Sequence, residues 1–327
     1  MPASNVSLPW PLTRLNPWYP GQYGVPGTDS ETGLRHHTVG RVFYVDPNHV
    51  DANDNRDGTD PNAPFATVGA ALAHCQSFAG DVILVMAMDA EDYSPGTGIA
   101  IDESVTVSVH GVSIIGVHRS GAQGVVWRPA AAAGTCITVK AIDVLIEGFY
   151  FDGYIGGGAG GDAIYADWDG LTTWGDNLIV RHCFFSDTID TAIEMEYTYN
   201  FWITDNVFQE CDVYGIYADP AGSGAAFGHI IGNQFHDCGA AIVGKIWNCE
   251  IAGNRIFNSA AQGGGAATNR GIDTSAGTGQ NLVANNWFSC LLPVAAPGDW
   301  NDLNTGDAAD AWPGNWLMNG MAVTTPT

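Results

Sequence analysis

The clearest pattern in the second half of the chain is a short alternation of apolar and polar positions that recurs at uneven intervals. An apolar residue is followed three positions on by Asn and five positions on by Phe or Ile. Four copies have this form, and two earlier ones lack the Asn: Ile203-Asn206-Phe208, Ile230-Asn233-Phe235, Ile251-Asn254-Ile256 and Val283-Asn286-Phe288, preceded by Ile146-Phe149-Phe151 and Val180-Cys183-Phe185. Successive copies start 21 residues (Ile230 to Ile251) to 34 residues (Ile146 to Val180) apart. A fixed element separated by variable insertions is typical of a solenoid.

A second apolar element keeps step with the first. Its copies are Ala163-Ile164-Tyr165, Ala192-Ile193-Glu194, Gly215-Ile216-Tyr217, Ala241-Ile242-Val243 and Gly271-Ile272-Asp273. Each coil therefore carries at least two short strands. Such strands cannot bury their apolar face alone, so successive coils have to stack in parallel, about 4.8 Å apart. We expect Asn206, Asn233, Asn254 and Asn286 to form a structural ladder whose amides hydrogen-bond between coils.

The start of this region adds a strand, a loop and a short amphipathic helix. The segments are Val42-Phe43-Tyr44-Val45-Asp46, Asp57-Gly58-Thr59-Asp60-Pro61 and Pro64-Phe65-Ala66-Thr67-Val68-Gly69-Ala70-Ala71-Leu72. Thr67 suits the N-cap of a helix near residues 67–76, and Val68, Leu72 and Cys75 fit one helical face.

With these elements, residues 42 to 290 resemble the right-handed parallel β-helix proteins of the pectate-lyase-like superfamily. The resemblance implies an all-β, single-chain solenoid whose open end is plugged by the short helix. It divides the chain into an arm (1–40), the β-helix (41–290) and a C-terminal cap or tail (291–327). The superfamily includes pectate and alginate lyases, polysaccharide hydrolases, phage tailspikes and non-enzymatic virion proteins, so the fold alone does not choose a function.

Composition and charge narrow the possible partners. The chain of 327 residues has 35 acidic and 11 basic side chains and a formal net charge of −24 at pH 7. Such a charge repels polyanions, so we expect no nucleic-acid binding, and acidic polysaccharides are disfavoured unless cations intervene. No apolar stretch approaches the length of a membrane span. The seven Cys show neither a disulfide framework nor a zinc spacing.

The N-terminal arm is rich in Pro and aromatic residues, with Trp10, Trp18, Tyr19 and Tyr23 set among six Pro. A segment of this kind forms neither a helix nor a central strand. Its aromatic side chains either fold back on the β-helix or anchor the protein in a partner.

One face of the second strand collects acids and tyrosines. Outward positions after the inward Ile are Tyr165, Glu194, Tyr217, Val243 and Asp273, and two residues later Asp167, Glu196, Asp219, Lys245 and Ser275. Carboxyl groups on adjacent coils suit glycoside hydrolysis, with Glu194, Glu196 and Asp219 as the catalytic candidates. Tyr165, Tyr217, Asp167 and Asp273 are candidates for glycan binding, since Tyr offers a flat apolar face with a polar tip. Chance placement of acidic residues on strands is the competing interpretation.

The loop from Asp51 to Asp60 is dense in oxygen-bearing side chains. Asp51, Asn53, Asn55 and Asp57 are candidate calcium ligands, although Pro64 stands where an EF-hand requires Glu. The alternative is a loop built from Asx turns. No other cofactor is expected.

The sequence favours a non-enzymatic virion surface protein, a β-helix spike or capsid decoration, with a polysaccharide-degrading tailspike-like hydrolase or lyase and a glycan-binding adhesin as alternatives. The chain begins without a signal-peptide pattern, which fits assembly in the host cytoplasm. The resemblance implies a homotrimer. The arm would contact other virion proteins such as the major capsid protein. The face of acids and tyrosines would contact a host surface glycan.

If residues 1–40 are an anchor, their deletion leaves a folded β-helix, because each coil of a solenoid contacts only its neighbours. Circular dichroism and thermal unfolding of the truncated chain test this. Loss of the cooperative transition would instead place Trp10 and Trp18 in the domain core.

Overall fold

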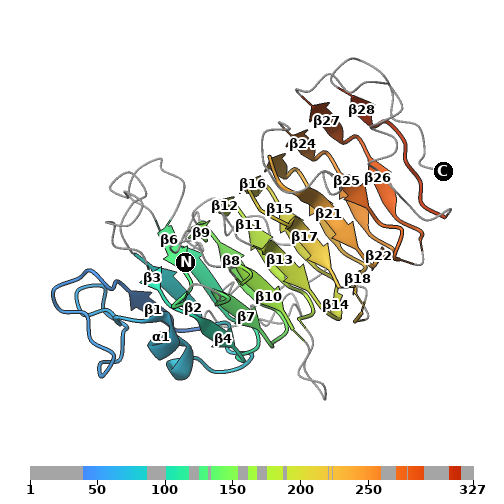
Figure 1. Ribbon diagram of the computed structural model, residues 1–327. Helices are drawn as coiled ribbons and strands as arrows, with labels where there is room; N and C mark the ends of the chain where they lie inside the picture. Colours follow the sequence, from blue (N-terminus) through green and yellow to red (C-terminus); the bar gives the residue numbers. More distant parts are fainter. Residues whose placement is uncertain are drawn as a thin grey trace, which may run out of the picture.

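The computed structural model describes residues 40–86, 101–117, 125–131, 134–153, 161–167, 175–186, 190–219, 221–222, 224–258, 270–277, 279–290 and 309–317. These residues form stacked coils whose strands build parallel sheets, with one short helix near one end (Figure 1). The expected all-β solenoid is confirmed. The anchoring candidates Trp10, Trp18, Tyr19 and Tyr23 lie outside the described residues.

Four sheets run along the described part of the stack. Sheet A contains β1 (Val42–Val45), β2 (Val82–Val85), β5 (Ser113–Gly116), β8 (Leu145–Glu147), β11 (Ile179–Arg181), β15 (Trp202–Thr204), β19 (His229–Ile231), β23 (Glu250–Ala252) and β26 (Leu282–Ala284). Sheet B contains β3 (Ile101–Asp102), β6 (Val125–Arg128), β9 (Phe149–Asp152), β12 (Phe184–Ser186), β16 (Val207–Gln209), β20 (Gln234–His236), β24 (Arg255–Asn258), β27 (Trp287–Cys290) and β28 (Trp316–Leu317). Sheet C contains β4 (Val105–Val107), β7 (Ile137–Val139), β10 (Ile164–Ala166), β13 (Thr191–Met195), β17 (Tyr214–Ala218), β21 (Ala240–Gly244) and β25 (Arg270–Asp273). Sheet D is short and contains β14 (Thr198–Tyr199), β18 (Ala225–Ala226) and β22 (Ile246–Trp247).

One coil visits the sheets in a fixed order. The chain passes from β17 in sheet C through β18 and β19 in sheets D and A to β20 in sheet B, and the next coil begins with β21 beside β17. Each strand therefore pairs in parallel with its equivalent one coil away. Side chains at equivalent positions stack in columns.

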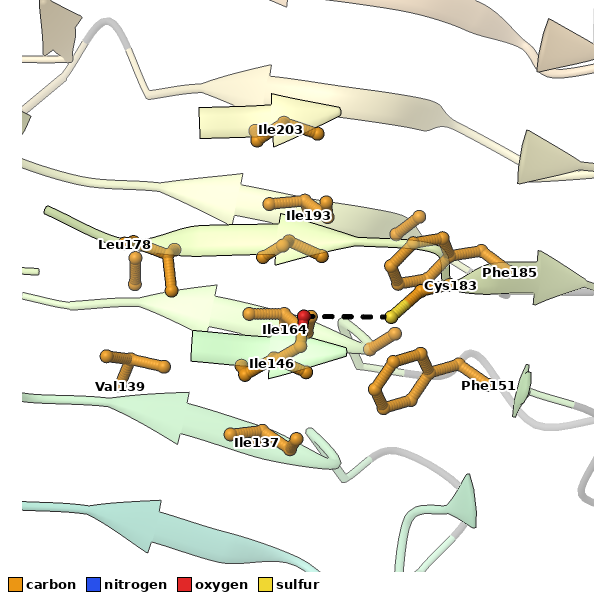
Figure 2. Close-up of a cluster of buried hydrophobic side chains, with 14 of the residues drawn as sticks. Ile137, Val139, Ile146, Phe151, Ile164, Leu178, Cys183, Phe185, Ile193 and Ile203 are labelled. Atoms are coloured by element: carbon orange, nitrogen blue, oxygen red, sulfur yellow. Dashed lines mark hydrogen bonds between the residues drawn. The ribbon is translucent and has the colours of Figure 1, made fainter. Parts of the chain in front are cut away.

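The interior is filled by these columns of apolar side chains (Figure 2). On sheet B the rings of Phe151, Phe185, Phe208 and Phe235 stack with centroids 5.0, 4.8 and 4.6 Å apart and interplanar angles of 11° or less. Isoleucines of sheets A and C lie across from them, among them Ile146 and Ile164. Each aromatic column is continuous because the register of the parallel strands never slips by a residue.

Helix α1 (Val68–His74) contributes to the core near the β1 end of the stack (Figure 1). The Thr67 side chain caps it, accepting a hydrogen bond of 3.1 Å from the main chain of Ala70. Val68, Ala71 and Leu72 are buried in the main core. The helix and its cap are as expected from the sequence.

The asparagine ladder is present and buried. The Asn206 side-chain Nδ2 donates to the Val180 carbonyl at 2.9 Å and to Asn233 Oδ1 at 3.1 Å, and that same oxygen accepts the Asn206 main-chain N–H at 3.0 Å. Asn233, Asn254 and Asn286 repeat the arrangement. The ladder thus satisfies turn groups that water cannot reach.

The ladder extends one coil beyond the boundary expected at residue 290. Asn315 accepts from Asn286 and donates to the Val283 carbonyl at 2.7 Å, while β28 pairs with β27. Trp312, Asn315 and Leu317 have the spacing of the repeat, with Trp in place of Ile or Val. Part of the predicted tail is therefore a further coil.

The residue before each ladder position has a left-handed backbone. Asp205, Asn285 and Gly232 have φ angles of 56°, 56° and 71°. At Gly232 an added Cβ would lie 2.7 Å from Asp205 Oδ1. These residue types adopt the conformation at low cost, so the turn recurs in every coil of the ladder.

We predict that Asn233→Ala lowers the free energy of unfolding by about 2–4 kcal/mol, since it leaves several buried polar groups without partners. Urea unfolding of the variant measures the change. Asn62→Ala is the control, because Asn62 is exposed and hydrogen-bonds within one turn. Equal stability of the two variants would show that the ladder does not hold the coils together.

Candidate active site

The candidate site lies on the outer face of sheet C. Strands β10, β13 and β17 pair so that Tyr165, Glu194 and Tyr217 stand side by side. Ile193 and Met195, which flank Glu194, point into the core. The alternation of a strand therefore fixes Glu194 on the outside, as the sequence predicted.

We use the name acidic face for the outward side chains of these strands and their flanks: Asp162, Tyr165, Asp167, Asp190, Glu194, Glu196, Tyr214, Tyr217 and Asp219. Asp167, Glu196 and Asp219 hold equivalent positions just after these strands. The main-chain N–H of Glu196 donates to the Ala166 carbonyl at 2.8 Å, and that of Asp219 donates to the Met195 carbonyl at 3.0 Å. The second expected column is thus in register.

Glu194 and Asp162 form a hydrogen-bonded pair of carboxyl groups. Burial is the main cause that raises the pKa of Glu194 to about 8, and the charges of Asp162, Asp219 and Asp190 and the hydrogen bond to Asp162 add to it. Burial likewise raises the pKa of Asp162 to about 6. The pair holds a proton at neutral pH because two adjacent carboxylates cannot both ionise cheaply.

The Tyr165 hydroxyl contacts the carboxyl groups of Glu196 and Asp167. It donates to Glu196 Oε2 at 2.8 Å and lies 3.4 Å from Asp167 Oδ1. Burial and these carboxylates raise the pKa of Tyr165, so its hydroxyl stays a donor. Asp167 also forms an ion pair of 2.6 Å with Lys140. Tyr165, Glu196 and Asp167 are therefore brought together by the structure.

Two further tyrosines form a stacked pair beside Glu194. The rings of Tyr214 and Tyr217 have centroids 4.5 Å apart at an interplanar angle of 8°. Both are half-buried, and Tyr217 lies beside Glu194 in the register of β13 and β17. Burial and the Asp219 charge raise the pKa of Tyr217 to about 12.

Not all predicted residues join the cluster. Asp273 is buried, is held by the Ser275 hydroxyl at 2.6 Å, and lies two strands from Tyr217 with Val243 between. Asp219 Oδ1 accepts the Ala221 N–H at 2.8 Å in a turn that follows β17. Asp219 therefore borders the carboxyl pair, whereas Asp273 does not.

Asp162, Asp190 and Tyr214 were not among the site residues predicted from the sequence. Asp162 and Tyr214 precede the inward Ile of their strands by two residues, where strict alternation would place them on the core side, so the period of the strand does not identify them. The glycine run before Asp162 hides the start of that strand in the sequence.

The loop with the calcium candidates is built from turns. Asn53 Oδ1 accepts hydrogen bonds from both nitrogens of Asn55 at 2.9 and 3.1 Å, and Asp57 Oδ1 accepts from the Thr59 N–H at 3.2 Å. Asp51 lies 3.8 Å from the Arg56 guanidinium. Among the described residues no group of three or more His, Cys, Asp or Glu could hold a metal ion. Calcium binding at this loop stays a prediction.

We predict that the free energy of unfolding falls as pH rises from about 4.5 to 8. The pKa of Glu194 is raised from its usual 4.5 to about 8, so the folded chain holds a proton that the unfolded chain releases in this window. Glu194→Gln should weaken this dependence and unfold at a temperature roughly 1–3 °C above wild type at pH 8. Parallel melting curves across pH 5–8.5 would contradict the shared proton, and Glu250→Gln on sheet A is the control.

Known solved structures resemble this chain at low sequence identity. No curated protein matches the chain by sequence. Among solved structures, an alginate lyase from Paenibacillus sp. str. FPU-7 is 13% identical with a TM-score of 0.49, the alignment covering 76% of this chain and 83% of the lyase. Tailspike protein 2 of bacteriophage CBA120 is 13% identical with a TM-score of 0.46, covering 84% of this chain and 43% of that one. A lacto-N-biosidase from Eubacterium ramulus is 11% identical with a TM-score of 0.42, covering 84% and 67%.

Within the described residues no helix is both long and apolar enough to cross a membrane. The model of the right handed beta helix region matches residues 97–288, which is more than half of the sequence. With its sheets stacked in parallel coil by coil, the chain belongs to the right-handed β-helix family.

Proposed function

We propose that the acidic face binds a neutral polysaccharide and hydrolyses its glycosidic bonds. The observation that carries the proposal is the hydrogen-bonded pair of Glu194 and Asp162 on an outer face that also bears stacked tyrosines. A carboxyl group that keeps its proton at neutral pH, close to others that are ionised, is the arrangement that glycoside hydrolysis requires.

In this proposal Glu194 is the general acid. Its proton passes to the glycosidic oxygen as the bond to the sugar carbon breaks, and burial together with Asp162 keeps the pKa of Glu194 high until that moment. Asp219 on the neighbouring strand is the second carboxylate. It either takes a proton from the attacking water or attacks the sugar carbon itself, and in both cases it has to be ionised. Glu196 is held by the Tyr165 hydroxyl, which suits a positioning role.

The charge of the face indicates the class of substrate. The six carboxyl groups of the acidic face and a chain net charge of −24 disfavour a polyuronate or a sulfated glycan. A neutral hexose chain has no such penalty, and its apolar ring faces can lie against Tyr217 and Tyr214. Hydrolysis is favoured over lysis, since the cations beside this face are engaged: Lys140 pairs with Asp167, and Lys245 Nζ donates to the Gly222 carbonyl at 3.2 Å.

The carboxyl pair also supports an enzyme over a passive virion surface protein. Desolvating two neighbouring acids costs stability, and a purely structural face gains nothing from that cost. The location on a virion, the trimer, the contact with the capsid through residues 1–40 and the host glycan remain predictions from the sequence. They are compatible with a polysaccharide hydrolase.

The test uses release of reducing ends from neutral bacterial polysaccharides. Glu194→Gln and Asp219→Asn should each lower the rate by about 10²- to 10⁴-fold, since each removes an acid or base. Glu250→Gln, a matched change on sheet A, should leave the rate unchanged. The wild-type rate should also fall above about pH 8, where Glu194 loses its proton.

No release of reducing ends by the wild-type protein from any neutral polysaccharide would overturn the enzymatic proposal. The same holds if Glu194→Gln and Glu250→Gln are equally active. Either result would return the face to the structural interpretation that the sequence favoured.

A further inference from the structure

In the part of the chain that the structure describes, one corner of the coil repeats a left-handed backbone conformation eight times. Its residues have φ angles between 53° and 71°, and they are Phe78, Gly111, Asp143, Asn177, Asn200, Phe227, Asn248 and Gln280. Each of the first seven donates its main-chain N–H to the carbonyl just before the equivalent residue of the next coil. Gly, Asn and Asp adopt this conformation readily, so most of the column is explained by its turn.

Phe227, like Phe78 at the start of the column, departs from this residue preference. A bulky L-residue is strained in a left-handed conformation, and burial of the side chain is the usual compensation. The Phe227 side chain is 52% exposed, so burial compensates little. Asn occupies the equivalent position both one coil before, at Asn200, and one coil after, at Asn248. The fold therefore has no need for Phe at this position.

The exposed Phe227 lies in a group of aromatic rings with the half-buried Tyr199 and Trp247, and we name these three residues the aromatic corner. The Tyr199 ring lies 6.4 Å from that of Phe227 and 6.1 Å from that of Trp247, centroid to centroid. Tyr199 and Trp247 are equivalent residues of β14 and β22, and the small Ala226 of β18 lies between them in the register. The two large rings therefore stand on either side of a buried alanine, with Phe227 next to it.

The aromatic corner continues the acidic face around the edge of the stack. Strands β14, β18 and β22 follow β13, β17 and β21 along the chain and lie beside them (Figure 1). Tyr199 is five residues from Glu194, at most about 17 Å along an extended chain. Lys245, in the same column as Glu196 and Asp219, has its Nζ 5.9 Å from the centre of the Trp247 ring.

We propose that the aromatic corner is a binding subsite for neutral hexopyranose units of the same polysaccharide chain that the acidic face cleaves. Sugar rings present apolar C–H faces, which fit the flat rings of Trp247 and Phe227. The Trp247 indole N–H can donate to a sugar hydroxyl at the ring edge. The strained, exposed Phe227 is then explained by contact with ligand.

The ligand class in this inference rests on the proposed function, but binding and hydrolysis are measured separately. Binding is measured in the Glu194→Gln background by calorimetry, with cello-, manno-, malto- and laminarihexaose as probes. Trp247→Ala and Phe227→Asn should each weaken the binding of the best probe by about tenfold, the effect of losing one stacked ring. Phe227→Asn should also raise the melting temperature, because Asn relieves the strained backbone.

Phe78→Asn is the matched control. Phe78 occupies the same corner with a φ of 60° and is 58% exposed, but it lies five coils away, about 24 Å along the stack. Its ring stacks on His110 instead of joining the aromatic corner. Phe78→Asn should leave binding of the probe unchanged.

Three results would overturn the subsite: no binding of any hexaose to the Glu194→Gln protein, equal binding by Phe227→Asn and Phe78→Asn, or a change of oligomeric state in Phe227→Asn measured by light scattering. The last would assign the aromatic corner to a contact between copies of the chain. Hexaose binding that depends on Phe227 and Trp247 without any release of reducing ends would support the subsite and refute hydrolysis. The two proposals can therefore fail independently.

Discussion

The stacked asparagines set the geometry on which the rest of the molecule depends. Each buried Asn amide bridges the coil before and the coil after it, so adding a coil satisfies the polar groups that the previous one left open. The ladder fixes where each turn occurs relative to the next strand. Insertions in one coil therefore do not shift the register of sheets A, B and C, and the phenylalanine column of sheet B remains continuous.

That fixed register also determines which side chains of sheet C become neighbours. Parallel strands about 4.8 Å apart place equivalent side chains in contact, whether or not they attract one another. The register places Tyr165 beside Glu194, and Asp162, which lies just before β10, forms with Glu194 a half-buried pair of acids that shares a proton. Tyr165 relieves part of the remaining repulsion by donating its hydroxyl hydrogen to Glu196. A rigid scaffold that imposes unfavourable neighbours is a means of holding a carboxyl group protonated at neutral pH.

Much of this could be read from the sequence. The spacing of Asn206, Asn233, Asn254 and Asn286 predicted the ladder, and the inward isoleucines predicted which acids face outward, because both follow from the period of a strand. The coil at Asn315 was missed since Trp312 replaces the usual aliphatic residue. The partnership of Glu194 with Asp162 was missed because the glycine-rich segment before Asp162 hides its register. The strain at Phe227 was not foreseeable, as nothing local in the sequence indicates a left-handed phenylalanine.

The central claim is that the Glu194–Asp162 pair retains a proton at neutral pH. Infrared difference spectroscopy between wild type and Glu194→Gln at pH 7 tests it directly, since protonated and ionised carboxyl groups absorb at separate frequencies. The account predicts the loss of one protonated carboxyl band in the variant, and disappearance of that band from wild type as pH rises through about 8. Loss of a carboxylate band instead would show that Glu194 is ionised, and would contradict the account of the site.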